Sequence, residues 1–272
     1  MSNMKGISVV VPVHEYNEVV ETLLKRCLTS IKDMAQNGKA YGVDTELIVV
    51  GPESVVDKDL ESLITYQEEE TSPFTKVVAL KNAGETDFCS QVNLAVEKSV
   101  AYDYFMIVEL DDAVTPKYLK SVSYYTDKRP NTTVFLPLVE LYELQTLASP
   151  VGYMNEIAWS NSFSDEELGS LNLDALNTYY NFNVTGGVFK TADFKKAGSL
   201  KPSIKVSFAY ELLLRMANLY GEVYIIPKVG YFHTVNRKDS LTDIYQQTVS
   251  QEEGSWWIKL AGQEYLFKKD RN

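Results

Sequence analysis

The sequence predicts an α/β protein with one mostly parallel sheet that is flanked by helices. Short β-rich runs alternate with helical periodicity through the N-terminal half. Strands separated by helices of about ten to twenty residues pair in parallel through right-handed crossovers. The first run, residues 7–11, is rich in β-branched residues, as expected for a strand that is covered on both faces. With 272 residues, 45% of them hydrophobic, the chain can bury one substantial core.

The elements of the N-terminal half are expected in a regular order. Pro12 ends the first strand, and apolar residues then recur at intervals of three and four from Val20 to Met34. This period indicates a long amphipathic helix that closes near Gly38. The following elements are strands at 46–50, 76–80, 104–110 and 132–140, and helices at 58–67, 87–99 and 117–128.

The alternation breaks down beyond Glu140. Residues 141–182 are rich in Asn, Ser, Tyr and Leu without a clear period, and we expect an insertion over the sheet. A helix at 208–220 and two short strands, 223–226 and 229–233, follow. Residues 255–270 have an aromatic face and a basic end. They predict a helix that docks on the body or on a second subunit, which would make a homo-oligomer, with a membrane-surface role as the alternative.

Composition restricts the partners and the compartment. The 26 basic and 37 acidic residues give a net charge of -11, which disfavours nucleic acid and anionic membranes as partners. Cys27 and Cys89 lie in apolar-periodic segments without metal-ligand spacing, which indicates reduced core thiols. No apolar run approaches the ~20 residues of a membrane helix, and residues 7–13 are too short for a signal sequence. We expect a cytoplasmic protein without a membrane span.

Polar residues collect where the predicted parallel strands end. In open α/β sheets, ligands bind beyond these carboxyl ends. The segments are "PVHEYNE", "GPES", "KNAGE" and "ELDD". No GxGxxG follows the first strand and no GxxxxGK[ST] is present, so the usual dinucleotide and P-loop motifs are missing.

The "ELDD" segment, Glu109 to Asp112, ends an apolar run with three acids. Divalent ions such as Mg²⁺ and Mn²⁺ bind carboxylate oxygens and keep positions open for substrate phosphates. Strand alternation places Glu109 and Asp111 on one side. The alternative is a solvated loop before the helix at Pro116, where negative charge is favoured.

Together, these blocks resemble a family-2 glycosyltransferase with the nucleotide-sugar-binding glycosyltransferase A fold, over residues 6–242. The blocks are "ISVVVPVHEYNE", "ELIVVGPES", "KNAGE", "SQVNLAVE", "FMIVELDDAVTP", "NVTGGVF" and "YELLLRMANLYGEVYIIPKVGYFHTVNRKDSLT". The resemblance implies a Rossmann-like nucleotide-binding sheet with a variable acceptor-side region. It also implies metal-dependent transfer of a hexosyl or pentosyl group from a nucleoside diphosphate sugar to an acceptor hydroxyl, with inversion. The catalytic domain would span 1–255, with a nucleotide-sugar half at 1–140, an acceptor-side half at 141–255 and a helical tail at 256–272.

The resemblance assigns residues to the donor nucleotide. The expected contacts are Pro12, His14, Glu15, Glu53, Asn82, Gln91, Asp111 and Asp112. Glu53 stands where the family usually has an aspartate. Asn82 has an alternative as a turn former, because Asn and Gly both tolerate left-handed geometry.

The resemblance also implies a Mn²⁺ or Mg²⁺ site. The family motif is Asp-x-Asp, and Glu109 takes the first position here. Asp111 is expected as the direct ligand between metal and diphosphate, and Asp112 as a supporting or nucleotide-positioning acid. His233 is expected as a third ligand, with a hydrogen-bonded rim residue as the alternative; imidazole suits Mn²⁺. Arg237 and Lys238 would follow as phosphate contacts.

The catalytic base has no direct counterpart. Alignment on "ELLLR" places the family's Glu-Asp pair at Phe208 and Ala209, so Glu211 is the expected base. Its alternative is an i,i+4 ion pair with Arg215, worth ~0.2 to 0.5 kcal/mol. The other candidates are Asp165, Glu166 and Glu167.

Two further features stay open. Gly186 and Gly187 either permit close backbone approach in the sugar and acceptor pocket or form a bulge. The acceptor could be a glycan, a small molecule or a modified nucleic acid. A nucleotide-sugar or glycan-binding module without a base is an alternative function, and a nucleotidyltransferase is another.

Overall fold

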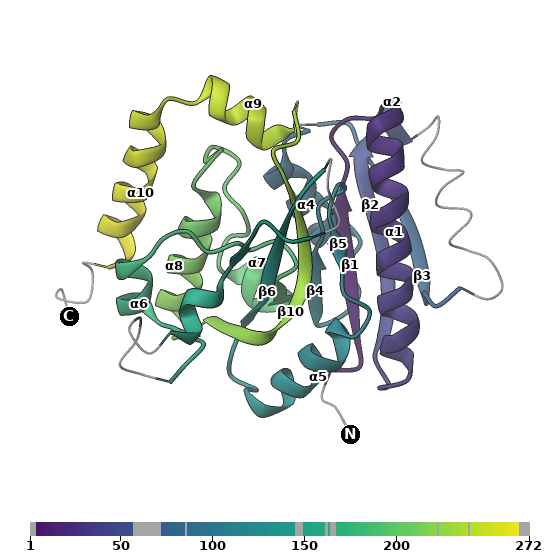
Figure 1. Cartoon of the computed structure of the whole chain (residues 1–272), viewed down its shortest axis with the longest axis horizontal. Coiled ribbons are helices and arrows are strands. Elements are labelled where there is room, and N and C mark those ends of the chain that lie inside the picture. The colour runs from purple at the N-terminus through teal and green to yellow at the C-terminus, as the bar shows by residue number, and fades with distance from the viewer. Residues whose placement is uncertain are drawn as a thin grey trace.

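The computed structural model describes residues 4–56, 72–84, 86–144, 149–160, 163, 167–221, 223–238 and 240–266. Within these ranges, ten strands form one sheet with the order β3-β2-β1-β4-β9-β6-β10-β5, while β7 pairs with β6 and β8 with β10 (Figure 1). The strands are β1 (Gly6–Pro12), β2 (Asp44–Pro52), β3 (Lys76–Asn82), β4 (Tyr104–Ile107), β5 (Ala113–Val114), β6 (Val134–Glu143), β7 (Gly152–Met154), β8 (Ser170–Leu171), β9 (Val188–Lys190) and β10 (Val223–Val235).

The helices are α1 (Glu18–Lys39), α2 (Glu53–Val55), α4 (Phe88–Lys98), α5 (Tyr118–Lys128), η3 (Glu156–Trp159), α6 (Leu173–Thr178), α7 (Thr191–Lys196), α8 (Phe208–Tyr220), α9 (Leu241–Thr248) and α10 (Gln251–Tyr265). Asn17 begins α1, because its side chain accepts hydrogen bonds from the backbone amides of Val19 and Val20 at 3.1 and 3.0 Å. None of the helices in the described parts of the chain has the length and hydrophobicity that crossing a bilayer requires.

Three of the four parallel strand pairings are long, and the pairing of β1 with β4 joins three residues. The strands β3, β2, β1 and β4 all run parallel, and β6 runs parallel to β10. The antiparallel pairings join only two or three residues each. The predicted α/β fold with a mostly parallel sheet is therefore confirmed, and its second half is mixed.

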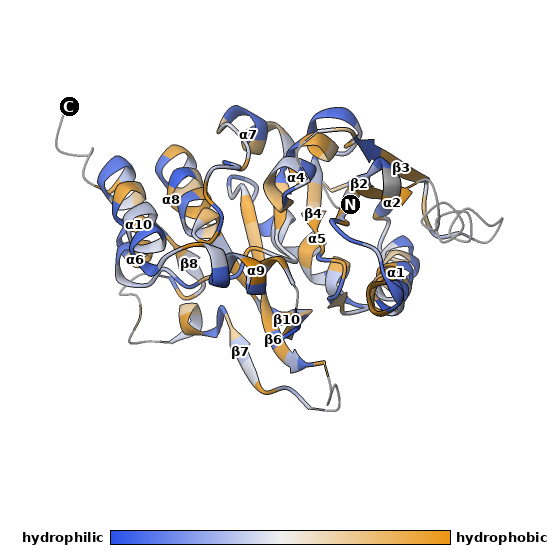
Figure 2. Ribbon diagram, turned by 90° about the horizontal axis from the view of Figure 1, so that it is seen from above, coloured by the Kyte–Doolittle hydropathy of each residue, from blue (hydrophilic) through white to orange (hydrophobic). Residues whose placement is uncertain are grey.

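The core lies on both faces of the sheet. Val9 and Val11 of β1 pack with residues of α1 and α5, while Val10 packs with residues of α4 and α8 on the other face. This double burial explains why β1 reads as a continuous apolar run. Figure 2 shows the hydrophobic colouring concentrated on the central strands and the hydrophilic colouring on the outer faces of the helices.

Several elements differ from the sequence-based expectation, among them β5, β9, α6 and α7, which were not expected. The two short strands expected around Pro227 form one long strand, β10, whose pairing with β6 shifts register between Ile225 and Tyr231. Proline cannot donate to the ladder, which accounts for an irregularity within one strand. The expected insertion at 141–182 partly extends the sheet, through β7 and β8. These strands are too short to produce a readable period. The helix α9 was not predicted, and the helix expected at 58–67 lies outside the described residues.

Candidate active site

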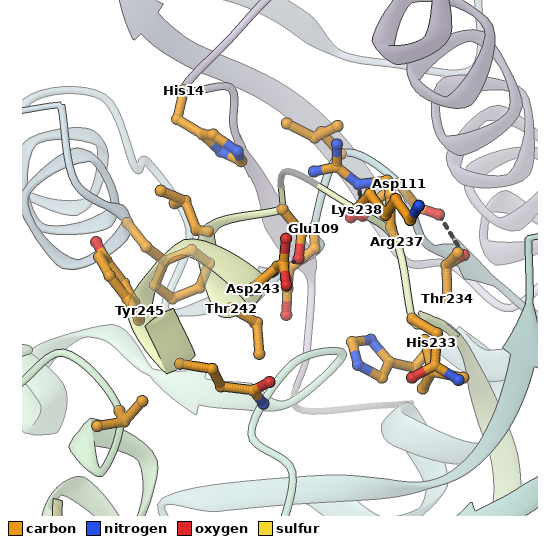
Figure 3. Close-up of a pocket in the computed structure, with 18 of the residues that line it drawn as sticks. His14, Glu109, Asp111, His233, Thr234, Arg237, Lys238, Thr242, Asp243 and Tyr245 are labelled. Atoms are coloured by element: carbon orange, nitrogen blue, oxygen red, sulfur yellow. Dashed lines mark hydrogen bonds and ion pairs between the residues drawn. The ribbon is translucent and has the colours of Figure 1, made fainter. Parts of the chain in front are cut away.

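A cavity of about 490 Å³ opens where β1, β4 and β10 end (Figure 3). Pro12 and His14 line it after β1, and Glu109 and Asp111 line it after β4. The segment from His233 at the end of β10 into α9 forms another wall. The cavity therefore lies at the carboxyl ends of parallel strands, where the sequence places it.

Glu109, Asp112 and His233 form one group. Each offers one ligand atom, and these atoms lie within 4.8 Å of one another. The Nδ1 atom of His233 lies 2.8 Å from Oδ2 of Asp112. The backbone amide of Thr234 donates to the other oxygen of Asp112 at 2.7 Å, so this fully buried carboxylate is held from two sides.

Burial of this group changes its proton affinities. Burial, with the charge of Asp112, raises the pKa of Glu109 to about 8. Burial disfavours protonated His233, but the Asp112 carboxylate overrides this and raises the pKa of His233 to about 10. The raised pKa of Glu109 means that a positive charge placed beside it would favour its ionised form. Carboxylate oxygens with one imidazole nitrogen are a ligand set that suits Mn²⁺, so the residues present fit a divalent cation.

Asp111 lies beside this group and pairs with an arginine. The Nε atom of Arg237 donates to Oδ2 of Asp111 at 2.7 Å, and another guanidinium nitrogen donates to Glu15 at 2.9 Å. Burial and the charge of Asp112 raise the pKa of Asp111, while Arg237 opposes this shift. In this structure the metal-type group therefore contains Asp112, whereas Asp111, expected as the direct ligand, faces Arg237.

Residues that the sequence analysis did not select hold the site together. Arg26 of α1 donates to the hydroxyl of Thr234 at 2.7 Å and to the backbone carbonyl of Asp111. The Thr234 hydroxyl donates to the same carbonyl at 2.6 Å. The Tyr231 hydroxyl accepts a hydrogen bond from the Glu109 amide at 2.9 Å. In the sequence, these residues could have been found from two signals, which are the half-buried Arg26 within the amphipathic helix α1 and the threonine next to His233.

Gly186 packs closely against the ring of Tyr231. It has φ of +72°, and a Cβ there would lie 2.4 Å from the Tyr231 ring. Only glycine tolerates both the left-handed conformation and this close contact. Gly186 therefore permits the close approach of a tyrosine ring that hydrogen-bonds the Glu109 backbone, while a role of the glycine pair in the sugar and acceptor pocket stays a prediction.

The expected nucleotide contacts divide into two sets. Pro12 and His14 line the cavity, and burial is the main cause that lowers the pKa of His14 to about 4. The residues Glu15, Glu53, Asn82, Gln91 and Asp112 are not among its described lining residues. The Asn82 side chain accepts from the amide of Gly84 at 2.9 Å, as a turn former does, and Gln91 donates to a backbone carbonyl of its own helix start at 2.6 Å.

Glu211 lies in a buried network in the first turn of α8. Arg215 donates two hydrogen bonds to it, at 2.9 and 2.8 Å. Lys201 lies at 2.6 Å, and the Tyr265 hydroxyl donates at 2.9 Å. Burial alone would raise the pKa of Glu211, but the bonds and charges of Arg215 and Lys201 lower it. This carboxylate is occupied by donors and is not among the described residues that line the cavity, so its role as the base stays a prediction.

Of the other acids considered for the base, Glu167 is in the described part of the chain. Glu167 is exposed and pairs with Arg129, and it is not among the described lining residues. Asp165 and Glu166 lie outside the described residues. The start of α8 presents Phe208 to the cavity instead of an acid.

No protein-family model and no curated protein sequence matches the chain. Solved protein structures do match the chain. The crystal structure of S. aureus TarS 1-349 in complex with UDP-GlcNAc matches with a TM-score of 0.65 and 16% identity, over 96% of this chain and 67% of that chain. The complex of the same fragment with UDP matches with a TM-score of 0.57 and 15% identity, over 98% and 73%.

The longer TarS chain matches with a TM-score of 0.58 and 16% identity, and the chain covers 44% of its length. TarS is a family-2-like glycosyltransferase with the A fold. At this level of identity, the likeness shows the fold. The fold expected from the sequence resemblance, a glycosyltransferase A-type sheet flanked by helices, is confirmed.

Proposed function

We propose that the protein is a metal-dependent glycosyltransferase that moves a sugar from a nucleoside diphosphate sugar to an acceptor hydroxyl, with inversion. The observation that carries this proposal is the cavity at the strand ends, which is lined by Glu109, His233 and Arg237. The fully buried Asp112, which is not among the described lining residues, completes the group with Glu109 and His233. The fold likeness to TarS, whose structures contain UDP and UDP-GlcNAc, supports a uridine diphosphate sugar as donor.

Glu109, Asp112 and His233 would hold Mn²⁺ or Mg²⁺. When bound, the ion would offset the charge that builds on the leaving diphosphate. Asp112 is suited to hold it, because hydrogen bonds from Thr234 and His233 fix both carboxylate oxygens. Such support keeps ligands oriented before the cation arrives.

Arg237 and Lys238 would neutralise the diphosphate from the other side of the cavity. Arg237 is buried and already pairs with Asp111 and Glu15, so its charge is held in place at the cavity wall. A phosphate that reaches it could take hydrogen bonds from the same planar guanidinium. The acceptor is proposed to be a glycan or another hydroxyl compound, since the net charge of -11 disfavours nucleic acid.

A thermal-shift titration tests the donor part of the proposal. Ligands that bind only the folded state raise the melting temperature. UDP with Mn²⁺ is expected to stabilise the wild-type protein more than either component alone. Asp112→Asn should remove the manganese-dependent part, whereas Asp33→Asn, at an exposed position of α1, should retain it. Equal shifts for wild type and Asp112→Asn would contradict the proposed metal site.

One observation favours a second candidate, a nucleotide-sugar-binding module without turnover. Glu211 is held in ion pairs, and Phe208 and Ala209 stand where the family has its acidic pair. Release of UDP from UDP-GlcNAc separates the two functions. The enzyme releases UDP, and the module binds UDP with Mn²⁺ without releasing it from the sugar.

A further inference from the structure

One side of α1 holds the backbone of the acidic segment, residues 109–112, that follows β4. The Cys27 thiol donates to the carbonyl of Glu109 at 3.4 Å, and the Arg26 guanidinium donates to the carbonyl of Asp111. These bonds restrain the backbone of the segment. Because the backbone sets the direction of each side chain, α1 also restrains the acids that the segment carries.

The bond from Arg26 belongs to a closed set of three hydrogen bonds. The same nitrogen, Nη2, donates to the Thr234 hydroxyl at 2.7 Å. This hydroxyl donates to the Asp111 carbonyl at 2.6 Å (Figure 3). A guanidinium group has donors only, Nη2 carries two hydrogens and a carbonyl oxygen has two lone pairs, so all three bonds can form together. Arg26 therefore joins the segment after β4 to the end of β10.

Thr234 passes this restraint on to Asp112. The backbone amide of the buried Thr234 donates to Oδ1 of Asp112 at 2.7 Å, and the preceding residue, His233, lies 2.8 Å from Oδ2. Asp112 and His233 belong to the proposed metal-binding group. The bonds of Arg26 thus reach the proposed ligands through Thr234 and through the backbone of Asp111.

We propose that Arg26 is a positioning residue for the divalent cation, an inference that rests on the proposed function. Through Thr234 it holds the Asp112 carboxylate and the His233 imidazole in the arrangement that the cation uses. Groups that orient metal ligands in this way contribute to affinity, and their loss typically weakens metal binding by about 10- to 100-fold. The metal site is therefore built from α1 as well as from the strand ends.

A purely electrostatic role for Arg26 predicts the opposite sign. Its guanidinium places a positive charge beside the acidic segment, so removal of that charge alone would make a cation bind more tightly. Arg26→Met removes both the charge and the two hydrogen bonds. Weaker binding of Mn²⁺ by this variant would show that the loss of positioning exceeds the gain from the lost charge.

Two positions of α1 provide matched controls. Lys25 is exposed and pairs with Glu21 on the preceding turn, so Lys25→Met removes the same charge away from the site. The Ser30 hydroxyl accepts a hydrogen bond from the amide of Val114 at 3.1 Å. Ser30→Ala therefore removes a bond between α1 and the chain beyond the acidic segment, without a change at Thr234.

The experiment titrates the full-length protein with Mn²⁺ alone and follows the electron paramagnetic resonance signal of the free ion, so it measures affinity without turnover. Arg26→Met should bind Mn²⁺ about 10- to 100-fold more weakly than wild type, whereas Lys25→Met and Ser30→Ala should stay within about threefold. Arg26→Lys keeps the charge and a donor, so its affinity should lie closer to wild type than that of Arg26→Met. Thermal unfolding verifies that each variant is folded.

Thr234→Val tests the path between Arg26 and the ligands. It keeps the backbone amide that binds Asp112 and removes only the hydroxyl between Arg26 and the Asp111 carbonyl. This variant should itself weaken Mn²⁺ binding, which keeps the inference testable if Arg26→Met does not fold. Because the two residues share one set of bonds, the double variant should weaken binding by less than the product of the two single fold-changes.

Several results would overturn the inference. These are unchanged or tighter Mn²⁺ binding by Arg26→Met, an equal loss in either control, no loss in Thr234→Val, or a double variant whose loss equals the product of the single losses. A wild-type protein that binds no Mn²⁺ would instead contradict the proposed metal site itself, and the inference with it.

Discussion

Removing the guanidinium of Arg215 should destabilise the fold, because the buried carboxylate of Glu211 would lose two of its hydrogen-bond donors. Arg215 and Glu211 are 4% and 3% exposed. Arg215→Met removes two hydrogen bonds to Glu211, at 2.9 and 2.8 Å, and two to the carbonyls of Ala197 and Ser199, at 2.5 and 2.7 Å. Breaking one side of a buried pair costs about 3 to 5 kcal/mol. Glu211 would keep Lys201 and Tyr265, so the lower end, about 3 kcal/mol, is expected.

Thermal and urea unfolding measure this loss. At roughly 2 to 4 °C per kcal/mol for chains of this size, the melting temperature should fall by about 6 to 12 °C. The double variant Glu211→Leu with Arg215→Met should be less destabilised than Arg215→Met alone, because it removes the stranded charge as well. A melting temperature within about 2 °C of wild type for the single variant would refute the reasoning. So would a double variant whose loss equals the sum of the two single losses.

Three further predictions concern pH, thiol reactivity and backbone strain. The folded-state pKa of Glu211 is lowered, so its contribution to the free energy of unfolding is present above its unfolded pKa and is lost as the pH falls through its folded pKa. The free energy of unfolding of Glu211→Gln should therefore fall less steeply with decreasing pH than that of wild type. Burial raises the pKa of Cys89 to about 12, so iodoacetamide at mildly alkaline pH should label this thiol only after denaturation, as mass spectrometry would detect. Gly186→Ala places a side chain on a backbone with φ of +72° and brings its Cβ within 2.4 Å of the Tyr231 ring. Urea unfolding should show that the free energy of unfolding falls by about 1 to 3 kcal/mol. An unchanged free energy of unfolding would show that Tyr231 can move aside.

The parts of the fold that depend on local pattern could be predicted from the sequence. The apolar run of β1 and the periodicity of α1 each carry their own signal, and both elements are confirmed. The full length of β10 could not be predicted from the local sequence, because the strand continues beyond Pro227 through its pairing with β6. The helix α9 has only eight residues and buries none of its side chains fully, so its few apolar positions form too short a pattern to be recognised as a helix.

The arrangement of the site was harder to predict than the fold, because it depends on contacts between segments that are distant in the sequence. The acids after β4 could be selected because they follow a buried strand directly. Their partners could not be assigned from spacing, since Asp112 meets His233 across 121 positions and Asp111 meets Arg237 across 126. For Glu211, the local pair with Arg215 was readable at i,i+4, whereas Lys201 and Tyr265, which complete its network, were not.

The bond between Tyr265 and Glu211 also orders events during synthesis. Tyr265 follows Glu211 by 54 positions, so the ribosome delivers α8 well before the hydroxyl that completes the carboxylate's surroundings. Until then, Arg215 and Lys201 alone must neutralise Glu211 in a partly formed interior. Docking of α10 is consequently a late step that completes the surroundings of this acid, and a ribosome stalled before Tyr265 would carry a nascent chain in which the side of α8 that contacts α10 is still uncovered.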